Sequence, residues 1–430
     1  MNAETGPDLH NAVNPHYLGH VVEAAAALET AASEDIVGGN GVKLLPKGAR
    51  IDDAMRERLL QHKLHKPLED CVEIRDGVSP AQLQPLAEQL LQEQPLLRTL
   101  CSEGRACGIP ALLGQLKLSL PVQALLTVHA HRDEQRLRHA VGVTVLTLGL
   151  ARRLLPGRIE LQRSLALAGL VHDIGELYID PALLRPGARL GTQDWRHIAS
   201  HPLVAHRVLR EMEGAGPEVA EAVLHHHERL DGFGYPRGAG GERFPLRLQL
   251  LAVSEWLMAF VERGTEAYAQ ASIASRLMPG EFNAELLQAI ADAARECGSA
   301  PAPAAAPVPP ADAAARVARI AAVLARSAEA ERLFEPHLRR ASPVMQAQVT
   351  AGLRRLLRIQ ASFSSTGLDT PQIEPLLADT QTRAEALAVV AELQWRLREL
   401  RREWTLRAGL VAADGGAAMC DTIAEVLDGA

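Results

Sequence analysis

The pattern of hydrophobic and polar positions predicts a mainly α-helical chain. Residues 122–155 form an amphipathic stretch, residues 164–171 an apolar run typical of a buried helix, and residues 250–259 a second apolar helix. That second helix contains a carboxylate, Glu255, which implies a polar partner inside the fold. Abundant Ala and Leu with only 3% aromatic residues also favour helical, aliphatic cores.

The N-terminal region departs from this helical pattern. Asn40-Gly41 lies between two short β-prone runs within residues 34–51, which predicts a hairpin. A helix over about residues 52–64 and a short strand over residues 71–74 would complete a small α+β module at residues 1–78. Ser79-Pro80 resembles a helix cap with a first-turn proline, so a helical connector is expected over residues 79–119.

The C-terminal region is predicted to be a separate helical region at residues 312–430. The Pro/Ala-rich residues 299–311 favour an extended linker before it. Apolar residues then recur at alternating spacings of three and four, which predicts a seam packed against another helix: Val390, Leu393, Leu397, Leu400 and Trp404. An intramolecular bundle face is the first interpretation, and a protein partner or dimer is the alternative. Five arginines are expected on a solvated face: Arg396, Arg398, Arg401, Arg402 and Arg407.

Composition narrows the class of protein. The 430 residues, 47% of them hydrophobic, suffice for two or three domains. A formal charge of −7 argues against a nucleic-acid polymer as partner. No apolar run approaches the roughly 20 residues of a membrane span, so we expect no membrane partner and a cytoplasmic location. Five cysteines without a CxxC pair argue against a disulfide framework or a zinc ribbon.

Two short motifs carry candidate metal chemistry. His226-His227 precedes a glycine-punctuated run that ends in Gly234-Tyr235-Pro236. Adjacent imidazoles suit a site where a cation shares their lone pairs, although an exposed polar turn is the alternative. His172-Asp173 closes the apolar run 164–171 and offers a nitrogen ligand with a carboxylate able to bridge two cations roughly 3.5–4 Å apart.

Two further histidines fit the same chemistry. His139 lies on the amphipathic stretch 122–155, and His201 is expected on a helix opened by Thr192 as N-cap. The other histidines near these motifs are expected to have surface or partly buried roles without a metal: His129, His131, His197, His206 and His225.

These motifs occur in the order and approximate spacing of the HD-GYP family, which residues 120–298 resemble. That family is a branch of the HD phosphohydrolases that hydrolyses cyclic di-GMP. The resemblance implies a helical HD-type domain with two or three divalent metal ions, iron or manganese. The implied ligands are His139, His172, Asp173, His201, His226, His227 and Glu255, with His172 and Asp173 also catalytic. The implied substrate contacts are Asp231, Gly232, Gly234, Tyr235, Pro236 and Arg263.

Four positions depart from the family pattern. Gln135 stands where an acidic ligand is common, and Glu255 stands where an Asp is usual. Glu176 replaces the lysine of the HDIGK motif, a charge reversal worth on the order of 4 kcal/mol at about 4 Å and an effective dielectric near 20. We therefore expect Glu176 to compensate as a ligand for Gln135. An arginine-rich run is also missing, which leaves Arg263 as the nearby candidate for a guanine contact.

The expected function is metal-dependent hydrolysis of cyclic di-GMP to pGpG or GMP in bacterial signalling. Because of Gln135 and Glu176, one alternative is a catalytically degenerate protein that acts as a cyclic di-GMP sensor or interaction scaffold. Because the arginine-rich run is missing, the second alternative is an HD phosphohydrolase for another nucleotide.

Overall fold

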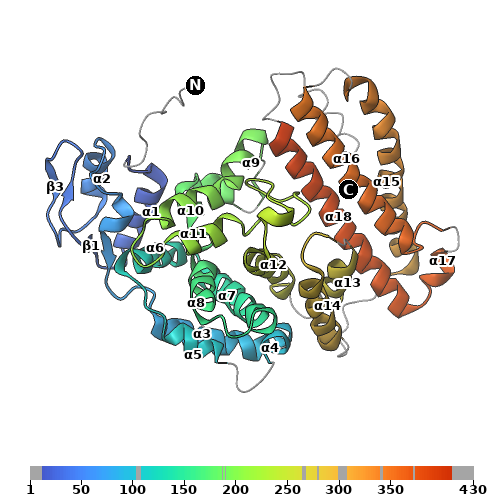
Figure 1. The fold of residues 1–430 in the computed structure, drawn as a ribbon, viewed down its shortest axis with the longest axis horizontal. Coiled ribbons are helices and arrows are strands. Elements are labelled where there is room, and N and C mark those ends of the chain that lie inside the picture. The colour runs from blue at the N-terminus through green and yellow to red at the C-terminus, as the bar shows by residue number, and fades with distance from the viewer. Residues whose placement is uncertain are drawn as a thin grey trace. The chain divides into compact units, whose positions relative to one another are not determined.

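A computed structural model describes residues 12–102, 108–185, 187–188, 190–263, 268–277, 280–298, 308–338, 342–370 and 373–408. The chain divides into two compact units, Met1–Arg189 with His197–Met258, and Leu190–Arg196 with Ala259–Ala430. Helices dominate both units, which confirms the predicted mainly α fold (Figure 1). Among the described helices, none is long and apolar enough to cross a membrane.

The first unit begins with the predicted small α+β module. Its elements are α1 (Pro15–Ala25), β1 (Thr30–Ala32), β2 (Ile36–Val37), β3 (Lys43–Leu45), α2 (Asp53–Leu60), η1 (Leu68–Cys71) and β4 (Val72–Ile74), where η marks a 3-10 helix. Strands β2 and β3 form the hairpin predicted at Asn40-Gly41, and Gly41 has a φ of 82°, in the left-handed region. β1 pairs antiparallel with β4.

The connector helices follow as α3 (Pro80–Glu93), α4 (Pro95–Cys101) and α5 (Ile109–Gly114). Ser79 and Gln82 form a capping box at the start of α3, as the Ser79-Pro80 signal predicted. Helices α3, α4 and α5 all pack on α7, the long helix that carries His139.

Further helices complete the part of the first unit that carries the two motifs. They are α6 (Leu120–His131), α7 (Glu134–Leu154), α8 (Ile159–Val171), η2 (Ile174–Tyr178), η3 (Pro181–Leu184), α10 (His201–Leu209), α11 (Pro217–Leu224), η4 (Gly241–Arg243) and α12 (Leu246–Val261); α9 (Thr192–Ala199) lies between η3 and α10. The predicted buried helix is α8, whose residues 165–171 are all buried. α8 packs along α7 and against α11 (Figure 1).

Two predicted helix boundaries are wrong. The amphipathic stretch 122–155 is not one helix, because Asp133 accepts a hydrogen bond from the Gln135 backbone N–H at 2.9 Å and caps the start of α7. His201 does not lie on the helix opened by Thr192. That helix ends at Ala199, and His201 starts α10 with Pro202 in its first turn, where a proline costs no hydrogen bond.

The second unit contains α13 (Tyr268–Leu277), α14 (Ala284–Gly298), α15 (Pro310–Leu338), α16 (Pro343–Ser365), α17 (Ile373–Leu376) and α18 (Thr380–Ala408). Most of the predicted linker 299–311 lies outside the described residues, and its last two residues belong to α15. The seam of α18 faces α13, α15 and α16 of the same unit, and its four aliphatic residues are buried. The seam is therefore an intramolecular bundle face.

The expectation that Arg396 lies on a solvated face is wrong. Its side chain is fully buried, whereas Arg398 and Arg401 on the same helix are exposed. The Arg396 guanidinium forms ion pairs with Glu281 and with Glu392, the latter at 2.8 Å. Because these partners lie inside the bundle, the charge pattern of α18 alone does not reveal them.

Candidate metal centre

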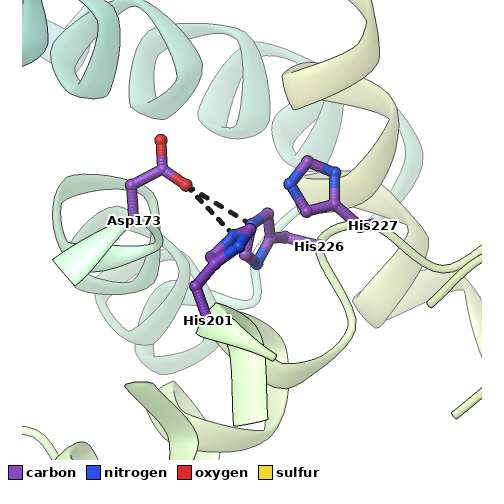
Figure 2. A group of neighbouring side chains, drawn as sticks. All are labelled: Asp173, His201, His226 and His227. Carbon is purple, nitrogen blue, oxygen red and sulfur yellow. Dashed lines mark hydrogen bonds and ion pairs between the residues drawn. The ribbon is translucent and has the colours of Figure 1, made fainter. Parts of the chain in front are cut away.

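The seven side chains predicted as metal ligands gather into two groups in the first unit. One group contains Asp173, His201, His226 and His227 (Figure 2), and the other contains His139, His172 and Glu255. Within each group, one potential ligand atom per residue lies within 4.8 Å of all the others. The ligand role of each residue remains a prediction, but the side chains are together.

Six separate elements deliver these side chains. His139 is on α7, His172 follows the last residue of α8, Asp173 precedes η2, His201 begins α10, His226-His227 follow α11, and Glu255 is on α12. Gly175 permits the closest approach among them. A Cβ atom on Gly175 would lie 2.0 Å from the backbone oxygen of His201, so a side chain there would push η2 away from α10.

Three of the imidazoles are oriented by backbone carbonyls. The Nδ1 atom of His172 lies 2.8 Å from the Gly169 oxygen, that of His201 lies 2.8 Å from the Ile198 oxygen, and that of His226 lies 2.6 Å from the Val223 oxygen. A carbonyl only accepts, so each Nδ1 carries the hydrogen and donates it. In the neutral ring the Nε2 atom then keeps its lone pair, which is the arrangement of a metal-ligating histidine.

The Nε2 atoms of these histidines lie close to one another. The Nε2 atoms of His201 and His226 lie 3.0 Å apart, although in the neutral tautomers neither has a hydrogen to donate to the other. The Nε2 atom of His172 is buried between two carboxylates, 3.2 Å from Asp173 and 3.3 Å from Glu255. Such an arrangement is unfavourable unless a cation or a proton lies between the nitrogens.

Two carboxylates complete the groups. Asp173 places Oδ1 at 3.4 Å from His201 Nε2 and 3.5 Å from His226 Nε2, while its Oδ2 lies 3.2 Å from His172 Nε2. Glu255 places Oε2 at 3.0 Å from His139 Nε2 and 3.3 Å from His172 Nε2. Asp173 therefore contacts both groups, one oxygen to each.

The electrostatics favour positive charge between these carboxylates. Burial would raise the pKa of Asp173, but its histidine neighbours, led by His172, hold that pKa well below its usual range. Burial opposes charge on His172 too, yet Asp173 and Glu255 raise the pKa of His172 to about 10. Burial lowers the pKa of His226 and of His227, so these rings stay neutral. Ionised carboxylates and neutral imidazoles are the forms that bind metal, so a metal ion would take the place of the His172 proton.

The donor set fits divalent metal ions. Imidazole nitrogens and carboxylate oxygens suit several transition metals, including iron and manganese, without distinguishing them. The facing Nε2 atoms of His201 and His226, with the Asp173 carboxylate beside both, are the structural observations that support this fit. These clusters are therefore able to hold metal ions.

The glycine-rich loop is organised by Glu228, which the sequence reasoning missed. Glu228 is fully buried and accepts backbone hydrogen bonds from Arg237 at 2.7 Å and Ala239 at 2.9 Å. Gly234 packs directly on it, since a Cβ atom on Gly234 would lie 2.2 Å from the Glu228 Cα atom. In the sequence, the only sign of this role is that Glu228 is an acidic residue directly after His226-His227.

The predicted substrate-contact residues of this loop have identifiable structural roles. Asp231 Oδ1 accepts a hydrogen bond from Phe233 N at 3.1 Å, and Gly232 has a φ of 79°, which together shape the turn. The Tyr235 ring, just before Pro236, stacks on His227 with centroids 4.6 Å apart. The loop therefore holds His227 in place. Substrate contact by these residues stays a prediction.

Two other predicted site residues lie outside both groups. Arg263 belongs to the second unit, where its guanidinium bonds to Gln270 at 3.1 Å and lies over the Phe260 ring. Glu176 forms an ion pair with Arg136 and is not a member of either group. Its role as a compensating ligand stays a prediction.

The histidines expected to have other roles stay outside the two groups among the described residues. His225, for example, places Nδ1 at 2.8 Å from the backbone oxygen of Glu221, and its ring stacks on Phe244. Gln135, the other departure from the family pattern, is exposed at the start of α7.

Comparison with known proteins identifies the class. Residues 123–279 match the HD domain family. This match agrees with the HD-GYP resemblance of the sequence, and the curated relatives include several cyclic di-GMP phosphodiesterases.

Three relatives illustrate the similarity. A cyclic di-GMP phosphodiesterase of Pseudomonas aeruginosa is 39% identical over 125 residues, which are 29% of this chain and 30% of that protein. A 3'3'-cGAMP-specific phosphodiesterase of Vibrio cholerae is 34% identical over 29% of this chain and 28% of its own length. The cyclic di-GMP phosphodiesterase response regulator RpfG of Xanthomonas campestris is 32% identical over 28% of this chain and 30% of its own length. The chain thus spans under a third of these relatives.

Proposed function

We propose that this protein hydrolyses a phosphodiester bond of cyclic di-GMP to give pGpG or GMP, with two or three divalent metal ions held by the seven gathered side chains. The observation that carries this proposal is the placement of Asp173, whose two oxygens contact the two groups separately. A carboxylate in that position can bridge two metal ions, as hydrolytic centres with paired metals require.

Bound metal ions would supply Lewis-acid stabilisation and an activated water. The residues of the chain have distinct tasks around that chemistry. His201 and His226 are pre-oriented by backbone carbonyls, so little reorganisation is needed during the reaction. Tyr235 covers one face of His227 and keeps that ring in position. His172 and Asp173 act at the centre, where the two groups meet.

A second candidate substrate is 3'3'-cGAMP. The relative from Vibrio cholerae that shares 34% identity is specific for this dinucleotide. The two substrates differ in one base and share the cyclic phosphodiester ring, so the metal centre itself does not distinguish them. The bases must be distinguished by residues outside the two groups.

The test uses the full chain, stripped of metal and reloaded separately with manganese or iron under anaerobic conditions. Cyclic di-GMP and 3'3'-cGAMP are each incubated with the loaded protein, and products are separated by chromatography. We expect linear product only in loaded samples, and none from Asp173→Asn. Binding of cyclic di-GMP without any linear product would instead establish a sensor, and exclusive cleavage of another nucleotide would replace the proposed substrate.

A further inference from the structure

A cluster of basic side chains in the first unit has no role in the reaction proposed above. It consists of His20 on α1, His129 near the end of α6, Arg132 at the C-cap of α6 and Arg136 in the first turns of α7. We call these four residues the basic cluster. They come from the N-terminal module and from the turn between α6 and α7.

Arg136 connects the basic cluster to the metal centre. Its Nη1 atom lies 3.0 Å from His129 Nε2 and forms an ion pair with Glu176, three residues after Asp173. His129 is within electrostatic reach of both Asp173 and His172. The basic cluster therefore lies beside the metal centre.

Buried donors of the basic cluster lack partners among the described residues. The Nη1 atom of Arg132 and the Nδ1 atom of His129 are buried without a hydrogen bond. Because a guanidinium only donates, His129 accepts from Arg136 through Nε2, and its Nδ1 carries a hydrogen that is available to an acceptor. His129 is only 3% exposed, so water does not readily satisfy this donor.

The charges around these donors favour an anion. Burial and then Arg136 lower the pKa of Arg132, and burial and then Arg132 lower the pKa of His20. Glu176 neutralises one arginine, whereas Glu23, which binds His20 Nδ1 at 3.1 Å, is 71% exposed. Added negative charge would therefore relieve the repulsion between Arg132 and Arg136.

We propose that Arg132, with His129 and Arg136, binds the second phosphate of a cyclic dinucleotide while the first phosphate lies at the metal centre. This inference rests on the proposed function. A cyclic dinucleotide carries two phosphodiester anions, and guanidinium groups bind phosphate through parallel N–H donors. Arg136 also cancels the charge of Glu176, which would otherwise repel an anionic substrate.

The first test measures inorganic phosphate binding to the full chain after metal removal, so that phosphate does not bind to metal ions. We compare Arg132→Met with Arg138→Met, a control on the same helix as Arg136 whose arginine pairs with Glu93. Arg132→Met should weaken phosphate binding roughly 10- to 100-fold, and the control should not.

The same variant has a second readout that a purely structural role would not give. Removing a guanidinium whose buried Nη1 atom has no hydrogen-bond partner should leave the melting temperature without phosphate unchanged or higher. Phosphate should then raise the melting temperature of the wild-type protein but not that of Arg132→Met. Wild-type phosphate binding by Arg132→Met, or a large stability loss without phosphate, would overturn the inference.

The final test separates this inference from the proposed function. With metal-loaded protein, kcat/KM is measured for cyclic di-GMP and for bis(p-nitrophenyl) phosphate, which carries one phosphodiester. Arg132→Met should lower kcat/KM for cyclic di-GMP roughly 10- to 100-fold more than for the smaller ester. Equal losses on both substrates would contradict the second-phosphate role. If the wild-type protein cleaves neither substrate, the proposed function fails, while phosphate binding still decides whether the anion site exists.

Discussion

The two units of this chain bury charged side chains in two different ways. In the second unit, Glu281 lies against both Arg355, at 3.0 Å, and Arg396, and Arg396 also holds Glu392. In the first unit, Asp173 and Glu255 lie among imidazoles whose Nε2 lone pairs point toward one another. One cluster contains its own cations, and the other has the donor atoms to take up a cation from outside. This difference separates a structural charge network from a candidate metal centre.

The largest expected effect comes from removing the carboxylate that joins the two groups. Asp173→Asn should abolish metal retention and lower phosphodiesterase activity a thousandfold or more, because bound metal supplies several kcal/mol of transition-state stabilisation. Metal analysis and product assays measure both effects. Asp180→Asn is the matched control, since Asp180 caps η3 through Ala182 N and asparagine caps equally well. Normal metal content in Asp173→Asn would show that Asp173 is not a ligand.

Breaking the charge network of the second unit should change stability and leave metal binding alone. Arg396→Met would leave Glu281 and Glu392 without this guanidinium, at a cost of about 3–5 kcal/mol in free energy of unfolding. Urea unfolding with metal analysis of the folded fraction tests this expectation. Arg398→Met, on the exposed face of the same helix, should change stability little. Metal loss in folded Arg396→Met would remove the distinction between the two clusters.

A smaller effect is expected at Gly175, where the metal centre depends on backbone packing. Gly175→Ala would place a Cβ atom 2.0 Å from the His201 oxygen, so η2 and α10 must separate. The cost should be about 1–3 kcal/mol of stability, with weaker metal binding because Asp173 and His201 move apart. Gly19→Ala is the control, as its added Cβ would have its nearest contact at 3.9 Å. Equal metal affinity in both variants would refute this packing role.

The smallest effect at neutral pH is expected from His129, whose contribution changes only as the pH falls below 6.5. Burial, and next the neighbouring Arg136, lower the pKa of His129 from 6.5 to about 3. The unfolded chain therefore binds a proton below pH 6.5 that the folded protein does not bind. Stability from His129 is complete above pH 6.5 and should fall by about 1.4 kcal/mol per pH unit as the pH decreases toward 3.

In His129→Gln this proton is no longer taken up on unfolding, so the free energy of unfolding should fall less steeply with decreasing pH than in the wild type. Unfolding curves of the variant and the wild type, measured at several pH values, give the two slopes. The arginines of the second unit keep their protons over this range, so Arg396→Met should leave the pH dependence due to His129 unchanged. An identical pH dependence in His129→Gln and wild type would mean that His129 is protonated in the folded protein.

The candidate metal centre was more predictable from the sequence than the buried charge networks. His172-Asp173 and His226-His227 are adjacent pairs, so their chemistry is visible in a few letters, and apolar helix patterns indicated which segments carry them. Glu228 was missed because its partners are backbone N–H groups of Arg237 and Ala239, which leave no mark in the sequence.

Arg396 shows the opposite limitation. It lies among other arginines on α18, and local charge pattern alone predicts a solvated face. Its burial follows from Glu281, 115 positions away in the chain, and from the packing of α13 against α18. The ion pair of Glu176 with Arg136 on another helix was missed for the same reason. Pairings between distant segments depend on tertiary structure, which periodicity does not encode.

The three oriented histidines share one feature with an evolutionary consequence. Each Nδ1 atom donates to the carbonyl of the residue three positions earlier, at Gly169, Ile198 and Val223. Every amino acid has that carbonyl, so the orienting partner survives substitution of the side chain at these positions. A substitution can therefore remove one of these histidines, whereas the carbonyl that orients it belongs to the backbone and stays. Drift at these three positions should be limited by packing rather than by metal chemistry.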